Sequence, residues 1–134
     1  MLERDGSQLF GDEHRAFRES VRRFIAREFS PRIAEFEEAG IVSRDFWRKA
    51  GDAGLLCPTM PETWGGPGLD FTFNAILNEE FTYAMMADTI TLQSDITMPY
   101  LLNYASDELK DRWLPGMLTG ETIGAIAMTE PGAG

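Results

Sequence analysis

Cysteine and histidine are almost absent from this 134-residue chain, which has one of each, Cys57 and His14. A single cysteine excludes an intrachain disulfide and suits a reducing compartment. One cysteine and one histidine also cannot form a zinc site of the usual Cys/His spacing. No Asp-rich loop of the EF-hand type is present, although magnesium or calcium sites built only from carboxylates stay open.

Basic charge and long apolar runs are also scarce. The chain has 12 basic residues against 22 acidic ones, a formal net charge of -10, which disfavours binding to nucleic acids. No apolar run is long enough to span a bilayer. Residues 1–14 are rich in acid and lack the apolar core of a secretory signal, so targeting sequences are disfavoured. We therefore expect a soluble cytoplasmic protein.

Hydrophobic residues at helical spacing dominate what is present. They make up 43% of the chain, enough for one domain with a core. The first helix is expected to begin near Asp12, and apolar side chains recur along it at Phe17, Val21, Phe24, Ile25 and Phe29. Further helices are expected after Ser30-Pro31, from Ser43 to Gly54, from about Thr72 to Gln93, from Asp95 to Ala105, and from Ser106 to Gly120 with a break around Pro115-Gly116.

The longest irregular stretch, CPTMPETWGGPGLD at residues 57–70, is rich in glycine and proline. Such a stretch raises the question of a phosphate-binding loop. No strand precedes it and no Lys-Ser/Thr pair follows it, so that reading is disfavoured. We expect a structural loop that crosses the end of a helical bundle.

Glu80 lies on the apolar face of the helix expected at residues 72–93. A carboxylate in that position is costly unless it has a partner. One interpretation is a general base with a raised pKa. The other is a structural carboxylate paired with an arginine or with loop N–H groups. We favour the structural interpretation, because structural pairing perturbs buried carboxylates as readily as catalysis does.

A strand pattern occurs only at Thr122–Met128, followed by the turn sequence TEPGAG. A lone strand cannot satisfy its own backbone groups, so it needs neighbours that this chain does not supply. The sequence thus predicts an all-α bundle of about six helices with one terminal strand.

Several segments together resemble the acyl-CoA dehydrogenase family of flavoenzymes. AMTEPGAG follows a helical domain of the right length, and PETWGGPGLD is similar to the family's Pro-Glu-x-x-Gly-Gly loop ahead of a long helix with Glu-Glu. SDELKDRWLPGMLTGETIGAIAMTEPGAG resembles the run from the last N-terminal helix into the first barrel strand. EEAGIVSRDFWRKAGDAGLL is similar to the long-chain branch. The resemblance covers residues 10–134.

The resemblance implies an N-terminal helical domain at residues 1–120. Residues 121–134 would form the first strand and turn of a middle β-barrel, and the rest of that barrel and a C-terminal helical bundle would lie outside this chain. The expected activity of the whole subunit is α,β-dehydrogenation of long-chain fatty acyl-CoA to trans-2-enoyl-CoA in fatty acid β-oxidation, with FAD as cofactor. An electron-transfer flavoprotein is the implied acceptor, and a homotetramer the implied assembly.

The same resemblance implies roles for particular residues. Those implied beside the flavin are Ile126, Ala127, Met128, Thr129 and Gly134, and those implied for the acyl chain are Gln93, Ser94, Met98, Leu101 and Leu102. Without the resemblance, these residues read as a strand end, a turn and core. The catalytic base is expected in the C-terminal bundle, so no catalytic residue is assigned here, and the chain alone is expected to be inactive and not to retain FAD.

Two other functions stay open. The chain would also suit a stand-alone helical module that binds acyl-CoA or a partner without catalysis. It would equally suit an acyl-CoA oxidase or a related flavin monooxygenase, which the N-terminal region discriminates poorly.

Overall fold

The computed structural model describes residues 9–85 and 89–132. Most of these residues are helical, and none of them is in a strand. The α-helices are α1 (Asp12–Phe24), α2 (Ile33–Ala39), α3 (Arg44–Asp52), α4 (Phe71–Tyr83), α5 (Thr89–Thr91), α6 (Met98–Tyr104) and α7 (Asp107–Thr119). Two π-helical turns, η1 (Ile25–Phe29) and η4 (Leu92–Thr97), and two 3-10 turns, η2 (Ser30–Arg32) and η3 (Glu62–Trp64), connect them. The expected all-α fold is confirmed.

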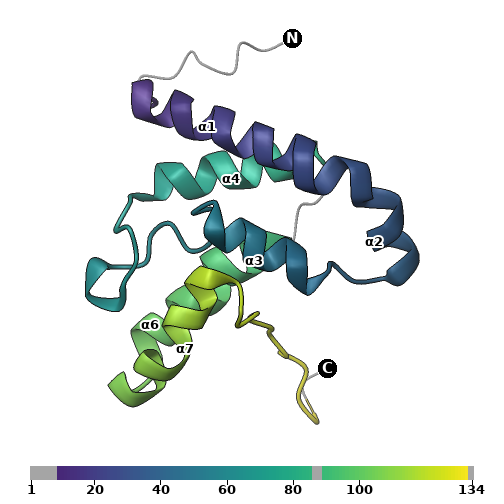
Figure 1. Ribbon diagram of the computed structural model, residues 1–134. Helices are drawn as coiled ribbons and strands as arrows, with labels where there is room; N and C mark the ends of the chain where they lie inside the picture. Colours follow the sequence, from purple (N-terminus) through teal and green to yellow (C-terminus); the bar gives the residue numbers. More distant parts are fainter. Residues whose placement is uncertain (1–8, 86–88, 133–134) are drawn as a thin grey trace.

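The helices form two neighbouring groups (Figure 1). Helix α1 packs along α4, and α3 packs against α7. Helices α6 and α7 lie side by side at the other end of the molecule, and the segment that follows α7 leads away from them. None of the helices that the structure describes is both long and apolar enough to cross a membrane.

Local sequence signals set several helix ends. The hydroxyl of Ser43 accepts a hydrogen bond from the backbone N–H of Phe46 at 3.2 Å and so caps α3. Ser106 caps α7 in the same way through the N–H of Leu109. Gly120 ends α7 with a φ of 74°, which glycine adopts at little cost. The helix starts predicted at the two serines are confirmed.

Two hydrophobic clusters form the core. The larger, here called the aromatic cluster, joins α1, α2, α3 and α4, and its centre is a group of four phenylalanines, Phe24, Phe29, Phe36 and Phe46. Their ring centroids lie 5.4–5.9 Å apart, a favourable spacing for aromatic pairs. The smaller, here called the methionine cluster, lies under α6 and α7 and consists of Cys57, Met60, Met98, Leu114 and Met117.

The helix expected at residues 72–93 is shorter in the structure. Helix α4 ends at Tyr83, and Met85 takes a left-handed conformation with a φ of 64° that a helix cannot continue through. Gln93 belongs instead to the following helical run, in which η4 leads directly into α6. The sequence near Met85 has no glycine or proline, so no local signal marked this end.

Helix α7 also differs from the prediction, because it continues through Pro115-Gly116 to Thr119. Proline in a helix removes one N–H donor, which leaves the carbonyl four residues earlier without its helical partner. That carbonyl belongs to Asp111, and Asp111 and Pro115 are both exposed. Water can therefore take the place of the missing donor.

The strand predicted at Thr122–Met128 was wrong for the chain as described. Residues 123–130 have no regular secondary structure. The described residues offer no second strand with which this segment can form a ladder, and a strand without a partner leaves its backbone groups to water.

Candidate functional site

A cleft of about 580 Å³ lies between the run from η4 into α6, helix α7 and the segment after α7. Ile96, Thr97, Tyr100 and Leu101 line one side, Trp113 and Met117 of α7 another, and Thr122 and Gly124–Met128 the third. The volume is that of a typical small-molecule site. No charged side chain is among these lining residues, so the cleft suits an apolar ligand.

The cleft brings together some of the residues predicted for the two ligands. Leu101, from the acyl set, faces Ile126, Ala127 and Met128, from the flavin set. Thr129 is exposed and lies just beyond this lining. Gly134 lies outside the residues that the structure describes. The roles of these residues stay predictions.

The other predicted acyl-chain residues do not line the cleft. Gln93 is fully buried, and its amide joins two backbone groups. The hydroxyl of Ser94 accepts a hydrogen bond from the N–H of Cys57 at 2.9 Å. Met98 belongs to the methionine cluster, and Leu102 packs against that cluster. These four side chains support the cleft from behind rather than form its surface.

The sequence did not indicate Thr97, Tyr100 and Trp113 as lining residues. The π-helical turn η4 holds Thr97 by a hydrogen bond from its hydroxyl to the carbonyl of Leu92 at 2.7 Å. A π-turn changes which side chains share a helix face, so 3.6-residue periodicity cannot assign them. The only available signal was the aromatic character of Tyr100 and Trp113.

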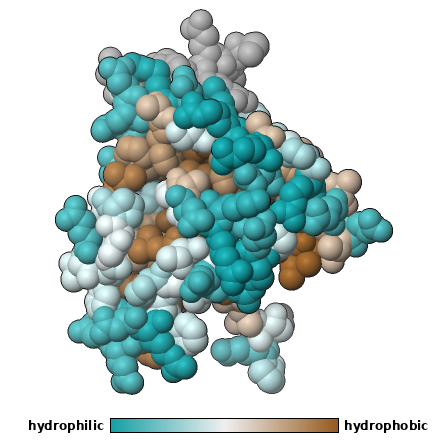
Figure 2. Space-filling view, viewed as in Figure 1, coloured by the Kyte–Doolittle hydropathy of each residue, from teal (hydrophilic) through white to brown (hydrophobic). Residues whose placement is uncertain are grey.

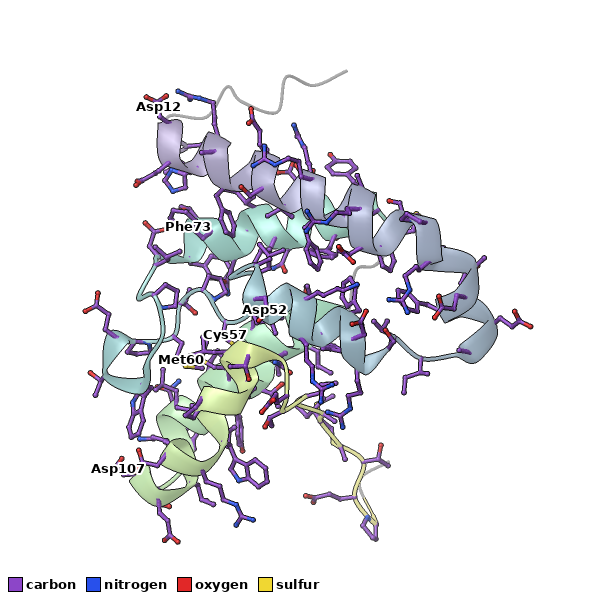
Figure 3. All side chains as sticks on the ribbon, in the orientation of Figure 1. Asp12, Asp52, Cys57, Met60, Phe73 and Asp107 are labelled. Atoms are coloured by element: carbon purple, nitrogen blue, oxygen red, sulfur yellow. The ribbon has the colours of Figure 1, made fainter. Side chains whose placement is uncertain are left out.

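The methionine cluster beneath the cleft holds the single cysteine. Cys57 and Met60 lie close together (Figure 3) and belong to the same buried cluster as Met98 of α6 and Met117 of α7. Burial raises the pKa of the Cys57 thiol to about 12, and this outweighs the opposing effect of its hydrogen bond with Ser94. The thiol is therefore protonated at neutral pH and is not a nucleophile.

Glu80 lies in a different place, between α1 and α4. Its carboxylate accepts hydrogen bonds from Arg18 Nη1 at 2.6 Å and from Arg22 Nε at 2.9 Å. Burial alone would raise the pKa of Glu80, but the hydrogen bonds from Arg22 and Arg18 outweigh it and hold that pKa below its ordinary value. The structural interpretation of Glu80 is confirmed, and the general base with a raised pKa is wrong.

The face of the molecule seen in Figure 2 is mostly hydrophilic, with smaller hydrophobic areas between the hydrophilic ones. Within residues 9–85 and 89–132, no group of three or more His, Cys, Asp or Glu side chains is placed to hold a metal ion. The candidate site is therefore an uncharged cleft beside the irregular segment that follows α7.

The profile of the family "Acyl-CoA dehydrogenase, N-terminal domain" matches residues 11–121. The match covers most of the chain, and the chain belongs to this family. The predicted resemblance to this family is thereby confirmed.

Individual relatives agree with the family assignment. The chain is 49% identical over 128 residues to the long-chain specific acyl-CoA dehydrogenase, mitochondrial, of Sus scrofa, which is 95% of this chain and 30% of that protein. The crystal structure of an acyl-CoA dehydrogenase from Geobacillus kaustophilus superposes with a TM-score of 0.88 at 42% identity, over 96% of this chain and 34% of that one. An acyl-CoA dehydrogenase from Bacillus anthracis, solved in complex with FAD, superposes with a TM-score of 0.79 at 32% identity, over 93% of this chain and 22% of that one. The chain thus spans about a third or less of these relatives.

Proposed function

We propose that this chain is the N-terminal part of a FAD-dependent acyl-CoA dehydrogenase that oxidises long-chain fatty acyl-CoA to the trans-2-enoyl-CoA. The observation that carries this proposal is the uncharged cleft, in a chain of this family, with Leu101 on one side and Ile126–Met128 on the other. The reaction needs an acyl chain and a flavin brought together at one place, and Leu101 and Ile126–Met128 line one cleft, which supports this proposal.

The role of the cleft itself would be to bind and orient the acyl chain. Each buried methylene contributes about 0.8 kcal/mol to such binding. The apolar side chains of Leu101, Met117 and Ile126 would also keep water away from the chain. Binding of this kind aligns the carbons to be oxidised before the chemical step.

The segment after Gly124 fits a role beside the flavin. Its described residues form no hydrogen bond to the helices, so the N–H groups of Met128 and Thr129 are free to donate. When bound, FAD accepts a hydride, and its ring then carries more negative charge. Backbone donors at the ring edge favour that change.

The rest of the subunit would supply what these residues lack. We propose a helical domain at residues 1–120 and the start of a β-domain at residues 121–134, with the catalytic base in a later part of the subunit. An electron-transfer flavoprotein as acceptor and a homotetramer as assembly belong to the same proposal. The cytoplasmic location expected from the sequence stays a prediction, and cell fractionation would test it.

Binding of palmitoyl-CoA by calorimetry tests the cleft, with CoA alone as the ligand control. Leu101→Glu places a charge in the lining and is expected to weaken binding at least tenfold. Leu109→Glu, on the exposed side of α7, is the matched control and should bind as before. Equal binding by both variants would contradict an acyl site in this cleft.

Activity tests separate the competing functions. The 134-residue chain is expected to show no dehydrogenation of palmitoyl-CoA with an artificial electron acceptor, and turnover by the chain alone would contradict the placement of the base. The complete subunit should form enoyl-CoA. Hydrogen peroxide as a stoichiometric product would instead indicate an oxidase.

A stand-alone acyl-CoA-binding module is the second candidate. The observation behind it is that the uncharged lining of the cleft suits an acyl chain even without a flavin. Tight binding of palmitoyl-CoA without flavin, together with inactivity of the complete gene product, would support it over the enzyme.

A further inference from the structure

The segment after α7 is held at three successive points. Arg44 Nη1 donates to the carbonyl of Glu121 at 2.9 Å, and the N–H of Thr122 donates to the carbonyl of Gly116 at 2.9 Å. The N–H of Gly124 donates to Oε1 of Gln93 at 2.8 Å. Among the described residues, those after Gly124 make no further hydrogen bond to the helices, so Gly124, which itself lines the cleft, is the last fixed point of the segment.

Gln93 differs from the other two contacts because its side chain is fully buried. Nε2 of the same amide donates to the carbonyl of Met117 at 2.8 Å. One side chain therefore joins η4, α7 and the segment. A buried amide with both ends paired is costly to replace by an apolar group, because its two partners are left without hydrogen bonds.

Gly124 is also in close contact with the helix that carries Gln93. A Cβ atom on Gly124 would lie 2.6 Å from Oγ1 and 2.8 Å from Cβ of Thr97. The segment is therefore seated directly on η4, with no room for a side chain between them. Ala125 to Met128, which follow at once, form one wall of the cleft.

We propose that Gln93 is a positioning residue for the cleft. By holding Gly124, it fixes the start of the wall formed by Ala125–Met128 and so sets the width of the cleft. Gln93 does so from behind the lining and does not itself touch the ligand. That the ligand is an acyl chain rests on the proposed function, whereas the positioning of the wall does not.

The first test compares Gln93→Met with Gln93→Glu in the 134-residue chain. Methionine has a similar length but no hydrogen-bonding amide, whereas glutamate keeps an acceptor for Gly124 in either protonation state. We expect amide exchange at Gly124 to become about tenfold faster in Gln93→Met, the size of one lost hydrogen bond, and to stay close to the original rate in Gln93→Glu. The matched control is Asn103→Leu, which removes an exposed hydrogen bond from the side-chain amide of Asn103 to the carbonyl of Pro99 on α6.

The second readout reports the wall itself. The methyl chemical shifts of Ile126 and Met128 should move toward those of an unstructured peptide in Gln93→Met, while the methyl shifts of Ile76 in the aromatic cluster stay unchanged. Unchanged exchange at Gly124 would overturn the proposal. Equal acceleration at Gly124 and at core amides would also overturn it, because Gln93 would then act only on global stability.

Gly124→Ala tests the same contact from the other side and does not remove the buried amide. The added methyl group must move the segment away from Thr97, so the shifts of Ile126 and Met128 should change as in Gln93→Met. Binding of palmitoyl-CoA to the unsubstituted chain separates the two proposals. If palmitoyl-CoA does not bind although Gly124 responds as expected, the acyl ligand is wrong and the positioning role stands.

Discussion

The aromatic cluster and the methionine cluster solve the same packing problem with different side chains. Phenylalanine has two rotatable side-chain bonds and a rigid ring, and the rings of Phe24, Phe29, Phe36 and Phe46 contact one another directly. Methionine has three such rotatable bonds and adapts to irregular spaces. Because Met117 belongs both to the methionine cluster and to the cleft lining, the adaptable part of the core is the part beneath the cleft.

The polar contacts near the two clusters also differ, because those beside the aromatic cluster are charged and those beside the methionine cluster are neutral. Helices α1 and α4 are joined by the charged side chains of Arg18, Arg22 and Glu80. Helix α7 and the segment after it are joined by the neutral amide of Gln93. Acid should therefore weaken the ionic link between α1 and α4 and leave the hydrogen bonds of Gln93 unchanged. The aromatic cluster is thus rigid and sensitive to pH, whereas the region around the cleft is adaptable and insensitive to pH.

The largest effect is expected from Phe46→Ala. Phe46 is fully buried and its ring contacts three other rings. Its removal leaves a cavity that rigid neighbours cannot fill, and the free energy of unfolding should fall by about 3–5 kcal/mol. Urea denaturation followed by circular dichroism measures this. A loss below about 1 kcal/mol would show that the aromatic cluster can rearrange after all.

Glu80→Ala is expected to cost somewhat less, about 3 kcal/mol, because it removes the partner of a buried arginine. Arg18 keeps its contact with Glu79, which limits the loss. The same urea titration measures the effect. The exposed pair of Glu19 and Arg23 provides the control, since Glu19→Ala should cost less than 1 kcal/mol. Equal costs for the two substitutions would remove the distinction between the buried and exposed pairs.

Acid should destabilise the chain in a defined pH range. Since the folded-state pKa of Glu80 lies below its ordinary value of 4.5, its contribution is complete above that value and is lost as the pH falls through the folded-state pKa. Urea midpoints between pH 7 and pH 3 should therefore fall below about pH 5, and less steeply in Glu80→Ala. Amide exchange should show α1 and α4 opening before α6 and α7. The reverse order would contradict the comparison of the two links.

The smallest effect is expected from Met98→Leu in the methionine cluster. The two side chains have similar volumes, and such exchanges usually cost less than about 1.5 kcal/mol. Because this cluster supports the cleft, the substitution should change palmitoyl-CoA affinity more than it changes the urea midpoint. An unchanged affinity together with a large loss of stability would show that the methionines form an ordinary core.

Most of the fold could be predicted from local sequence signals, whereas the cleft could not. The serines that begin α3 and α7 and the glycine that ends α7 have short-range roles that sequence spacing can express. For Glu80, the sequence predicted a partner such as arginine, because a carboxylate on an apolar helix face is costly unless it is paired. The residues of Thr122–Met128 have high β-propensity, but the described residues give them no partner strand. The missing tertiary partner therefore outweighs the local propensity.

The roles of Gln93 and Thr97 could not be predicted from the sequence, because they depend on contacts between distant parts of the chain. Gln93 joins groups 24 and 31 residues away along the chain, and no spacing rule connects them. The π-turn that carries both residues adds one residue to the usual helical repeat. The family resemblance implies that Gln93 lines the acyl-chain site, and that role stays a prediction, while the structure places the Gln93 side chain behind the lining of the cleft.

The burial of Cys57 has a practical consequence for chemical labelling. This residue has the only thiol in the chain, and that thiol is buried and protonated at neutral pH. Alkylating reagents attack the exposed thiolate, so iodoacetamide can modify the folded protein only when the methionine cluster opens. The rate at which Cys57 is alkylated thus measures local opening beneath the cleft, and a bound ligand that closes the cleft should lower that rate.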